Sequence, residues 1–330
     1  MDPFLFELSG EHPSMPLAEA LTLISIHSPL RMIEIGPGYL VSEMERGALD
    51  TIAERVALTH RIGCHLFTCH PSELLIRAKR IRLPEGTFSI RLKRFGGSMP
   101  SIQPNDIIRK LGAIFASSNK VDLENPSLEV RVFVSDRISV HIVEKTIDRA
   151  SMDSRKVALR PYFSPISLHP RYARALVNLT GAKKGERVLD PFCGTGGILL
   201  EAADMGLIPI ASDISKDMVD GCRENLEHFG YELYEDAVCD VADIADIFGK
   251  VDAVVTDPPY GRSTSTGGEP LDELYTRALS ASHRVLNCGG SIGIALPHEM
   301  SKTKGFRDQY HFSQKVHRSL TRHYHVLRKK

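Results

Sequence analysis

From residue 185 onward, short apolar runs alternate with longer stretches whose apolar residues recur at helical spacing. This alternation is typical of a parallel, doubly wound α/β sheet with right-handed crossovers. Two later β-like runs, Gln309–Lys315 and Thr321–Arg328, predict an antiparallel hairpin at one edge of that sheet. The expected strands are Arg187–Asp190, Ile208–Asp213, Tyr234–Asp240, Val251–Thr256 and Ser291–Leu296, and the expected helices are Gly197–Met205, Ser215–Phe229 and Leu271–Leu286.

The amino-terminal half contains stretches with helical periodicity and stretches with strand-like alternation. A helix is predicted over Pro16–Ile26, between strand-like runs at Phe4–Leu8 and Arg31–Ile35. From Phe88 to Phe95, apolar residues alternate with Ser89, Arg91 and Lys93, which predicts a half-exposed strand with a basic face. We therefore expect two small α+β modules before the doubly wound domain.

The expected divisions are residues 1–50, residues 51–149, an extended proline-rich linker over 150–170, and the doubly wound domain over 171–330. Of the 330 residues, 42% are hydrophobic and 25% are charged, which is ordinary for a water-soluble protein of two or three domains. The chain has no apolar run of about 18 residues and no signal-peptide pattern at its start. We therefore expect a cytoplasmic protein with no membrane partner.

Charge is uneven along the chain, although the formal net charge is zero. Residues 61–110 carry ten Lys or Arg against three Asp or Glu, and residues 301–330 carry nine against one. Residues 171–260 carry eight against seventeen. Basic segments on either side of an acidic middle fit a polyanion such as RNA, with solvated surface charge as the alternative. The candidate contacts are Arg77, Lys79, Arg80, Arg91, Lys93 and Arg94.

The six cysteines are scattered, which favours neither a disulfide framework nor a four-ligand zinc site. Cys64 and Cys69 lie among three histidines, but their spacing matches no standard zinc pattern. A helix with buried thiols explains them as well, so we expect no metal.

The most informative stretch is Val254-Val255-Thr256-Asp257-Pro258-Pro259-Tyr260-Gly261. The apolar run predicts a buried strand, and the prolines end it, so Asp257 lies at a carboxyl end, where open α/β sheets bind ligands. The Asp257 carboxylate and the Pro258 carbonyl can accept both hydrogens of an exocyclic amine, while Tyr260 stacks on its ring. The candidate catalytic residues are Asp257, Pro258, Pro259 and Tyr260.

A glycine-rich loop, Asp190-Pro191-Phe192-Cys193-Gly194-Thr195-Gly196-Gly197, follows the strand that ends at Asp190. Gly194 and Gly196 match a dinucleotide pattern, but Leu199 occupies its third glycine position. Asp190 would also oppose a phosphate, and it suits a cationic ligand such as S-adenosylmethionine. Cys193 lies beside this cofactor loop, and no histidine accompanies it in the motif to favour a nucleophilic role.

Two further acids follow the next strands. Asp213 is placed to accept hydrogen bonds from ribose hydroxyls, and Asp240 from an adenine amino group, with the Val241 N–H meeting a ring nitrogen. Any single aspartate here could instead be a helix N-cap. Four acids at successive strand ends, together with the glycine loop and the double proline, favour a ligand site.

These motifs resemble those of class I methyltransferases that modify exocyclic amines of bases. Together with Leu159-Arg160-Pro161, His169-Pro170 and the stretch from His317 to Arg322, they are similar to the archaeal THUMP-containing tRNA guanine N2-methyltransferases that act at position 10. Leu8-Ser9-Gly10-Glu11-His12 and Thr59-His60-Arg61 resemble motifs of the amino-terminal half of that family. The resemblance covers nearly the whole chain.

The resemblance implies a ferredoxin-like subdomain over 1–50, a THUMP domain over 51–149 and a Rossmann-like methyltransferase domain that uses S-adenosylmethionine. It also implies that Asp190, Gly194, Gly196, Asp213 and Asp240 hold the cofactor, that Phe163 and His169 pack over it, and that the catalytic residues hold guanine. The THUMP domain is expected to capture the single-stranded CCA end of tRNA. Whether one or two methyl groups are added stays open.

Other functions fit parts of this pattern. The same catalytic motif serves an adenine N6 amine or a guanine in ribosomal RNA, because an aspartate, two prolines and a tyrosine do not distinguish the two bases. A non-catalytic RNA-binding protein with a degenerate cofactor fold is a third reading, which the intact motif at Asp257 disfavours. An NAD-dependent oxidoreductase is disfavoured by the missing third glycine.

Overall fold

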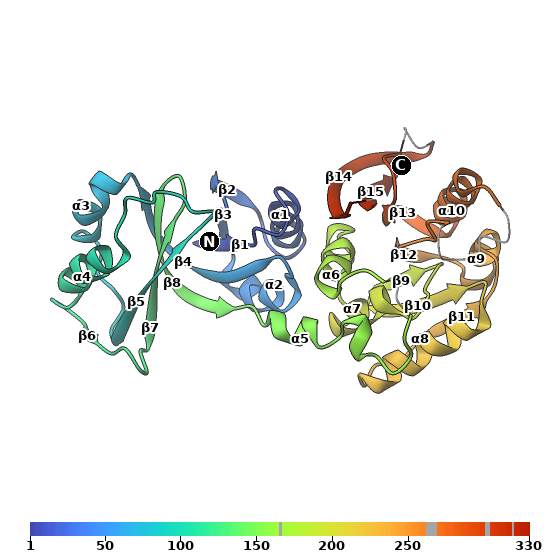
Figure 1. Ribbon diagram of the computed structural model, residues 1–330, viewed down its shortest axis with the longest axis horizontal. Coiled ribbons are helices and arrows are strands. Elements are labelled where there is room, and N and C mark those ends of the chain that lie inside the picture. Colours follow the sequence, from blue (N-terminus) through green and yellow to red (C-terminus); the bar gives the residue numbers. More distant parts are fainter. Residues whose placement is uncertain (165–166, 262–268, 301–303, 319) are drawn as a thin grey trace. The chain divides into compact units, whose positions relative to one another are not determined.

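The computed structural model describes residues 1–164, 167–261, 269–300, 304–318 and 320–330. The chain forms two compact units (Figure 1): Met1–Glu54 with Leu58–Ile147, and Arg55–Ala57 with Asp148–Lys330. Pro165 of the expected linker and Ser319 of the carboxyl-terminal motif lie outside the described residues. No helix in the described ranges has the length and apolar character needed to cross a membrane.

The first unit is built on one eight-stranded sheet with the order β2-β3-β1-β4-β8-β7-β5-β6. β4 pairs antiparallel with both β1 and β8, so it joins the two α+β modules that the sequence predicts. The strands are β1 (Asp2–Leu8), β2 (Arg31–Gly36), β3 (Tyr39–Met44), β4 (Thr59–Cys69), β5 (Thr87–Arg94), β6 (Lys120–Val121), β7 (Leu128–Val134) and β8 (Ile138–Thr146). The helices are α1 (Met15–His27), α2 (Leu49–Arg55), α3 (Leu74–Ala78) and α4 (Pro104–Phe115), with 3₁₀ turns at Arg46–Ala48 and Pro71–Glu73.

Cys64 and Cys69 lie in β4, so the helix suggested for these thiols is wrong. β4 has neighbours along both edges and buried residues on both faces, so it lacks the strict alternation by which a half-exposed strand is recognised. The basic face predicted for β5 is confirmed at Arg91 and Lys93, which are exposed, whereas Ser89 is buried.

The second unit contains a seven-stranded sheet with the order β11-β10-β9-β12-β13-β15-β14. β9 to β13 pair in parallel, and β15 lies antiparallel between β13 and the edge strand β14, which confirms the predicted fold class. The strands are β9 (Arg187–Asp190), β10 (Ile208–Asp213), β11 (Glu235–Val238), β12 (Val251–Thr256), β13 (Leu286–Leu296), β14 (Phe306–His317) and β15 (Leu320–Lys329). The helices are α5 (Arg149–Asp153), α6 (Pro170–Leu179), α7 (Gly197–Asp204), α8 (Lys216–His228), α9 (Ile244–Phe248) and α10 (Leu271–Val285), with 3₁₀ turns at Val157–Leu159 and Val241–Asp243.

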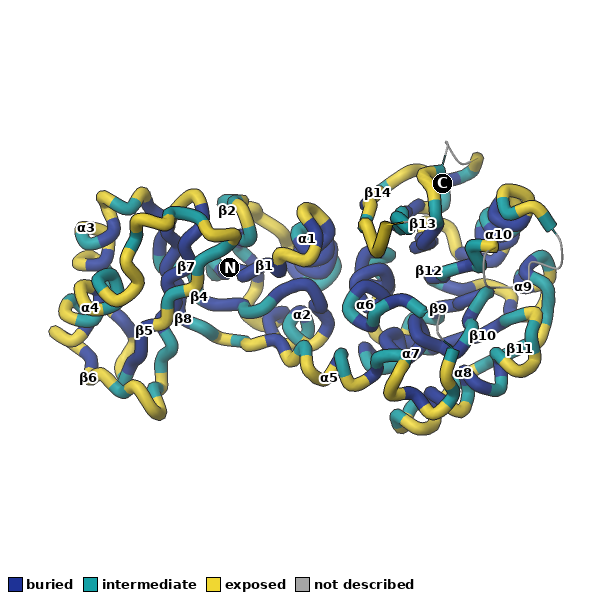
Figure 2. The backbone as a smooth tube through the Cα atoms, viewed as in Figure 1, coloured by how far each residue is buried: buried dark blue, intermediate teal, exposed yellow. Residues whose placement is uncertain are grey.

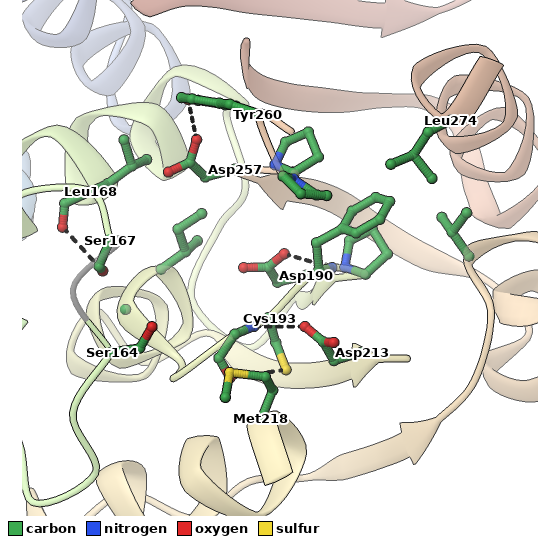
Figure 3. A pocket seen from close by; sticks show the side chains of 18 of the residues that line it. Ser164, Ser167, Leu168, Asp190, Cys193, Asp213, Met218, Asp257, Tyr260 and Leu274 are labelled. Carbon is green, nitrogen blue, oxygen red and sulfur yellow. Dashed lines mark hydrogen bonds between the residues drawn. The ribbon is translucent and has the colours of Figure 1, made fainter. Parts of the chain in front are cut away.

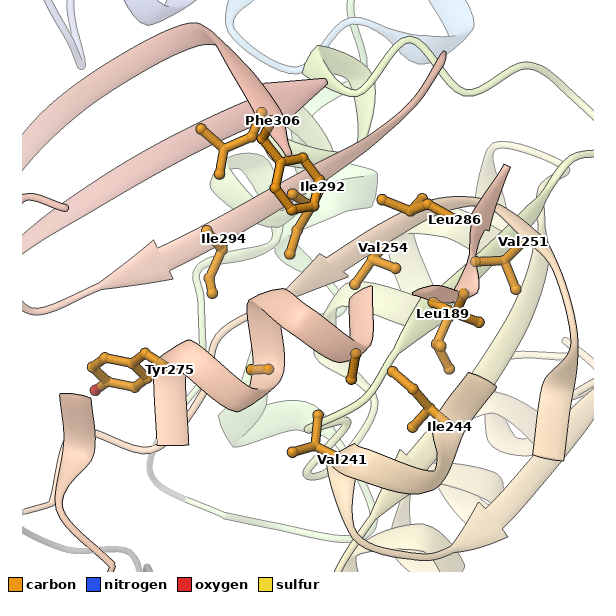
Figure 4. Close-up of a cluster of buried hydrophobic side chains, with 14 of the residues drawn as sticks. Leu189, Val241, Ile244, Val251, Val254, Tyr275, Leu286, Ile292, Ile294 and Phe306 are labelled. Atoms are coloured by element: carbon orange, nitrogen blue, oxygen red, sulfur yellow. The ribbon is translucent and has the colours of Figure 1, made fainter. Parts of the chain in front are cut away.

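Helices cover both faces of this sheet. On one face, Leu189, Ile210 and Val254 pack against α9 and α10 in one buried hydrophobic cluster (Figure 4). On the other face, Ala211 packs against α7 and α8, with Cys222 and other apolar residues of those helices. The central strands β9, β10 and β12 are accordingly mostly buried (Figure 2). With both faces covered, the loops at the carboxyl edge of the strands are left free to form a site.

The extended conformation expected for residues 150–170 is wrong for two parts of this stretch, which form α5 and a 3₁₀ turn. Arg155 and Arg160 are each only 4% exposed. Arg155 donates to Glu201 of α7 at 2.7 Å, a burial that the proline-rich sequence does not reveal. The three predicted domain boundaries themselves stay predictions.

Candidate functional site

A cleft of about 1140 Å³ opens at the carboxyl ends of β9, β10 and β12 (Figure 3). Its walls also include Leu168, which precedes α6, and the first residues of β15. Most of the predicted site residues line it: Asp190, Cys193, Gly194, Asp213, Asp240, Val241, Asp257, Pro258, Pro259 and Tyr260. The cofactor loop and the predicted catalytic motif therefore share one cavity.

Asp190, the last residue of β9, is only 2% exposed. Its Oδ1 accepts hydrogen bonds from Thr256 Oγ1 at 2.7 Å and from the backbone N–H of Phe192 at 3.1 Å. Burial raises the pKa of Asp190 to about 7, against the lowering effect of these two hydrogen bonds. No ion pair between described residues involves this carboxylate, so it lies at the cleft without a neutralising cation.

The glycine loop that follows Asp190 is shaped by two left-handed residues. Gly194 has φ 48°, its backbone N–H donates to Asp213 Oδ2 at 3.1 Å, and a Cβ added there would meet no atom within 4 Å. Gly196 has φ 78°, and a Cβ there would come within 2.7 Å of Cys222 Sγ. The loop therefore offers open backbone at Gly194 and packs tightly against α8 at Gly196.

Asp213 ends β10 and accepts a second backbone hydrogen bond, from Ser215 at 3.0 Å. Burial raises the pKa of Asp213, against the lowering effect of its backbone hydrogen bonds. Two largely buried carboxylates, Asp190 and Asp213, thus flank the glycine loop.

Asp240 differs from these two acids because a cation already engages it. Its Oδ1 accepts from the Ala242 N–H at 2.8 Å and from Arg277 Nη1 at 2.5 Å. The hydrogen bond from Arg277 holds the pKa of Asp240 below its usual value. Arg277 also pairs with Glu269 at 2.7 Å. Asp240 is therefore both an N-cap and an ion-pair partner, and Val241 beside it lines the cleft.

Asp257 follows β12, and its side chain is 12% exposed. The Tyr260 hydroxyl donates to Oδ1 of Asp257, and Arg322 Nη2 lies 3.8 Å from Oδ2. Burial raises the pKa of Asp257, while Arg322 and Tyr260 act against that rise. The turn is fixed further by Tyr275, whose hydroxyl donates to the Pro259 carbonyl at 2.8 Å.

Three predicted cofactor residues are not among those that line the cleft. Gly196 packs against Cys222 of α8, and Phe163 is 59% exposed. His169 caps α6 by accepting from the Arg171 N–H, and it lies 3.6 Å from Asp153. Whether Phe163 and His169 pack over the cofactor therefore stays a prediction.

Several cleft residues carry roles that local sequence reasoning missed. Thr256 binds Asp190, Arg277 binds Asp240, and Arg322 faces Asp257. Thr256 adjoins the predicted motif and could have been suspected from its hydroxyl. The two arginines come from α10 and β15, so only tertiary pairing brings them to their acids.

The six basic residues predicted to contact RNA all lie in the first unit, but not on one face of its sheet. Ile90 of β5 belongs to the core that includes residues of α3 and α4, so Arg91 and Lys93 project from the opposite face. Arg77 lies in α3, and Lys79 and Arg80 follow it, all three exposed. Arg94 donates to the carbonyl of Ile102 at 2.6 Å.

Comparisons with known proteins add to this geometry. Residues 158–327 match the RMKL-like methyltransferase domain, and residues 76–143 match the THUMP domain. The chain is 38% identical over 97% of both chains to the tRNA (guanine(10)-N2)-dimethyltransferase of Methanothermobacter thermautotrophicus. The chain belongs to the tRNA (guanine(10)-N2)-dimethyltransferase family. The family member of Pyrococcus abyssi is 35% identical over 98% of this chain and 99% of its own.

Solved structures agree on the fold. TrmN from Thermus thermophilus covers 99% of this chain and all of its own, with a TM-score of 0.58 and 22% identity. A methyltransferase-fold protein crystallised with S-adenosylhomocysteine covers 99% of this chain and 98% of its own, with a TM-score of 0.52 and 14% identity. Together with the family match, these likenesses place the carboxyl-terminal unit among methyltransferase folds.

Proposed function

We propose that this protein transfers methyl groups from S-adenosylmethionine to the exocyclic N2 amine of guanine 10 in tRNA, once and then a second time, in the cytoplasm. The observation that carries this proposal is the single cleft in which Asp257, Pro258 and Tyr260 lie next to the cofactor loop. Family membership supplies the base and its position, because full-length relatives carry that activity in their names.

The residues at the cofactor loop fit S-adenosylmethionine. Asp190 and Asp213 are largely buried acids with raised pKa values, and a ligand with a positive charge and hydroxyl groups would compensate their burial. Gly194 leaves room for a ligand to approach the backbone. In the proposal, Asp190, Asp213, Asp240, Val241 and the loop from Cys193 to Gly196 hold the cofactor, with Phe163 and His169 moving toward it in the loaded enzyme.

When bound, S-adenosylmethionine supplies an electrophilic methyl group. The chain must then orient the guanine amine, whose lone pair is delocalised into the ring. Asp257 and the Pro258 carbonyl accept the two amine hydrogens, which favours a pyramidal nitrogen and stabilises the positive charge that develops on it. Tyr260 stacks on the extruded base and releases Asp257 Oδ1, which its hydroxyl engages in the free protein.

For the amino-terminal unit we propose capture of the single-stranded CCA end of tRNA by the THUMP domain. Because the six basic candidates project from two sides of the sheet, paired charge reversals can locate the contact. Lys79→Glu with Arg80→Glu tests the α3 side, and Arg91→Glu with Lys93→Glu tests the β5 side. The pair on the binding side should weaken tRNA binding at least tenfold in a filter-binding assay, with a reduced salt dependence.

The test of the function is a methylation assay with labelled cofactor, followed by nucleoside analysis of the product. We expect N2-methylguanosine and then N2,N2-dimethylguanosine in a tRNA transcript with guanine at position 10. A transcript with adenine at that position should take up no label. Labelling of ribosomal RNA in preference to tRNA, or appearance of N6-methyladenosine, would refute the proposal.

A further inference from the structure

Arg322 reaches the catalytic motif because of the way β15 is inserted into the sheet. β15 runs antiparallel to β13, with Leu296 opposite His323. The first residues of β15 therefore lie at the carboxyl edge of the parallel strands, where Asp257 follows β12. The carboxyl-terminal hairpin thus extends the sheet and also contributes a wall of the cleft.

The side chain of Arg322 is 12% exposed, as is that of Asp257, and Nη2 lies 3.8 Å from Oδ2 of that carboxylate. Its guanidinium carbon lies 5.9 Å from the centroid of the Tyr260 ring. The buried Nε has no hydrogen-bond partner among the described residues. One cation therefore faces both side chains to which the proposed function assigns the base.

We propose that Arg322 is a positioning residue that keeps Asp257 ionised and holds the ring of Tyr260 beside it. The proposal rests on the function proposed above, in which the negative charge of an ionised Asp257 stabilises the positive charge that develops on the amine. An opposite charge about 4 Å away favours the ionised form of a carboxylate, and burial opposes it. Arg322 supplies that charge at a place where the acid is largely removed from water.

No other basic group among the described residues is placed to do this. Apart from Arg322, the titratable groups that face Asp257 are the acid Asp190 and the tyrosines Tyr260, Tyr275 and Tyr324. Asp257 raises the pKa of Asp190, and of the tyrosines only Tyr260 donates a hydrogen bond to Asp257. Charge compensation at Asp257 thus depends on one residue of β15.

The rival role for Arg322 is a contact with an RNA phosphate. A phosphate contact requires an accessible guanidinium, and its loss would weaken tRNA binding. It predicts a raised KM for tRNA with an unchanged rate at saturation. A role at Asp257 instead predicts a changed pH dependence of the saturated rate, with little change in KM.

The first experiment measures the pKa of Asp257 in the free protein by carbon-13 NMR of labelled aspartate carboxyls, with Asp257→Asn to assign the signal. We expect Arg322→Met to raise this pKa by about one unit or more and Arg322→Lys to restore most of the wild-type value. Arg328→Met, an exposed arginine on the same strand, is the matched control and should leave the pKa unchanged. An unchanged pKa in Arg322→Met would overturn the proposal.

The second experiment measures single-turnover methylation from pH 5.5 to 8.5 with tRNA and cofactor saturating. The acid limb of the profile should move to higher pH in Arg322→Met, by the same amount as the pKa, and move back in Arg322→Lys. A uniform loss at every pH, or an effect on KM alone, would contradict the proposal. If the wild-type enzyme methylates no tRNA, the proposed function fails, whereas the NMR result still decides whether Arg322 controls Asp257. Circular dichroism establishes that each variant is folded.

Discussion

The carboxylates at the two ends of the cleft have different partners. At the β9 and β10 end, Asp190 and Asp213 have backbone or hydroxyl donors and raised pKa values, and no described cation pairs with either. At the β12 end, Asp257 faces Arg322 at 3.8 Å. Burial raises the pKa of Asp190, Asp213 and Asp257, yet of these three acids only Asp257 faces a cation of the protein.

This difference indicates which ligand each end of the cleft binds. A carboxylate that lacks a cation is ready for a ligand that brings one, as the proposed cofactor does with its sulfonium. A carboxylate that must accept hydrogens from a neutral amine needs its charge maintained by the protein. Since Asp257 also raises the pKa of Asp190, the two ends are linked electrostatically across the cavity.

The largest expected effect is a loss of methylation rate when the acid at the base end is changed. Asp257→Asn should reduce the single-turnover methylation rate on the order of 100-fold or more, because a neutral amide does not stabilise the positive charge that develops on the amine nitrogen as a carboxylate does. Rapid-quench assays with saturating cofactor measure this rate. Asp246→Asn, on the exposed side of α9, should keep the wild-type rate. A loss of rate below about threefold in Asp257→Asn would show that Asp257 does not take part in the methyl transfer.

The next effect concerns stability. Folding raises the pKa of Asp190 from 3.8 to about 7, so the folded state holds this proton more tightly and stability falls as pH rises through that window. Asp190→Asn removes this penalty. Asp190→Asn should therefore stabilise the protein relative to wild type, and this gain in the free energy of unfolding in urea should be about 2 kcal/mol larger at pH 8 than at pH 5. A difference that does not change with pH would show that Asp190 is not the buried acid described here.

Cofactor affinity should also depend on pH. With a pKa of about 7, Asp190 is mostly protonated at pH 6, and a cationic ligand must displace that proton. The dissociation constant of S-adenosylmethionine should accordingly rise about tenfold between pH 8 and pH 6 in the wild type. Calorimetry in two buffers of different ionisation enthalpy should detect the released proton. In Asp190→Asn, both the release and most of the pH dependence should disappear.

The smallest effect is expected at Asp240, where the ion pair with Arg277 is partly exposed. Arg277→Met should weaken S-adenosylmethionine binding about threefold, since solvent screens such a pair. Arg284→Met, farther along the same helix and exposed, serves as the control. An effect as large as that of losing Asp190 would mean that Arg277 contacts the ligand itself.

Local sequence was enough for features that depend on neighbouring residues. The doubly wound order follows from the alternation of strands and helices, and the positions of Asp190 and Asp257 follow from strands that end at a proline or glycine turn. The edge hairpin was also predicted, with β15 correctly antiparallel. These features depend on hydrophobic periodicity and on turn-forming residues, both of which act over a few residues.

Features set by distant partners could not be predicted in the same way. β4 was missed because pairing on both sides hides its period. Arg155 of the expected linker is buried against Glu201, which lies in a helix 46 residues further along the chain. Arg277 and Arg322 reach their acids through the packing of α10 and the register of β15, neither of which local motifs encode.

We assign one end of the cleft to the cofactor and the other to the base, each with its own acids. Titration of S-adenosylmethionine into wild type, Asp190→Asn and Asp257→Asn by calorimetry at pH 8 tests this division. We expect Asp190→Asn to weaken binding at least tenfold and Asp257→Asn to bind within about twofold of wild type. Equal weakening in both variants, or a loss confined to Asp257→Asn, would contradict it.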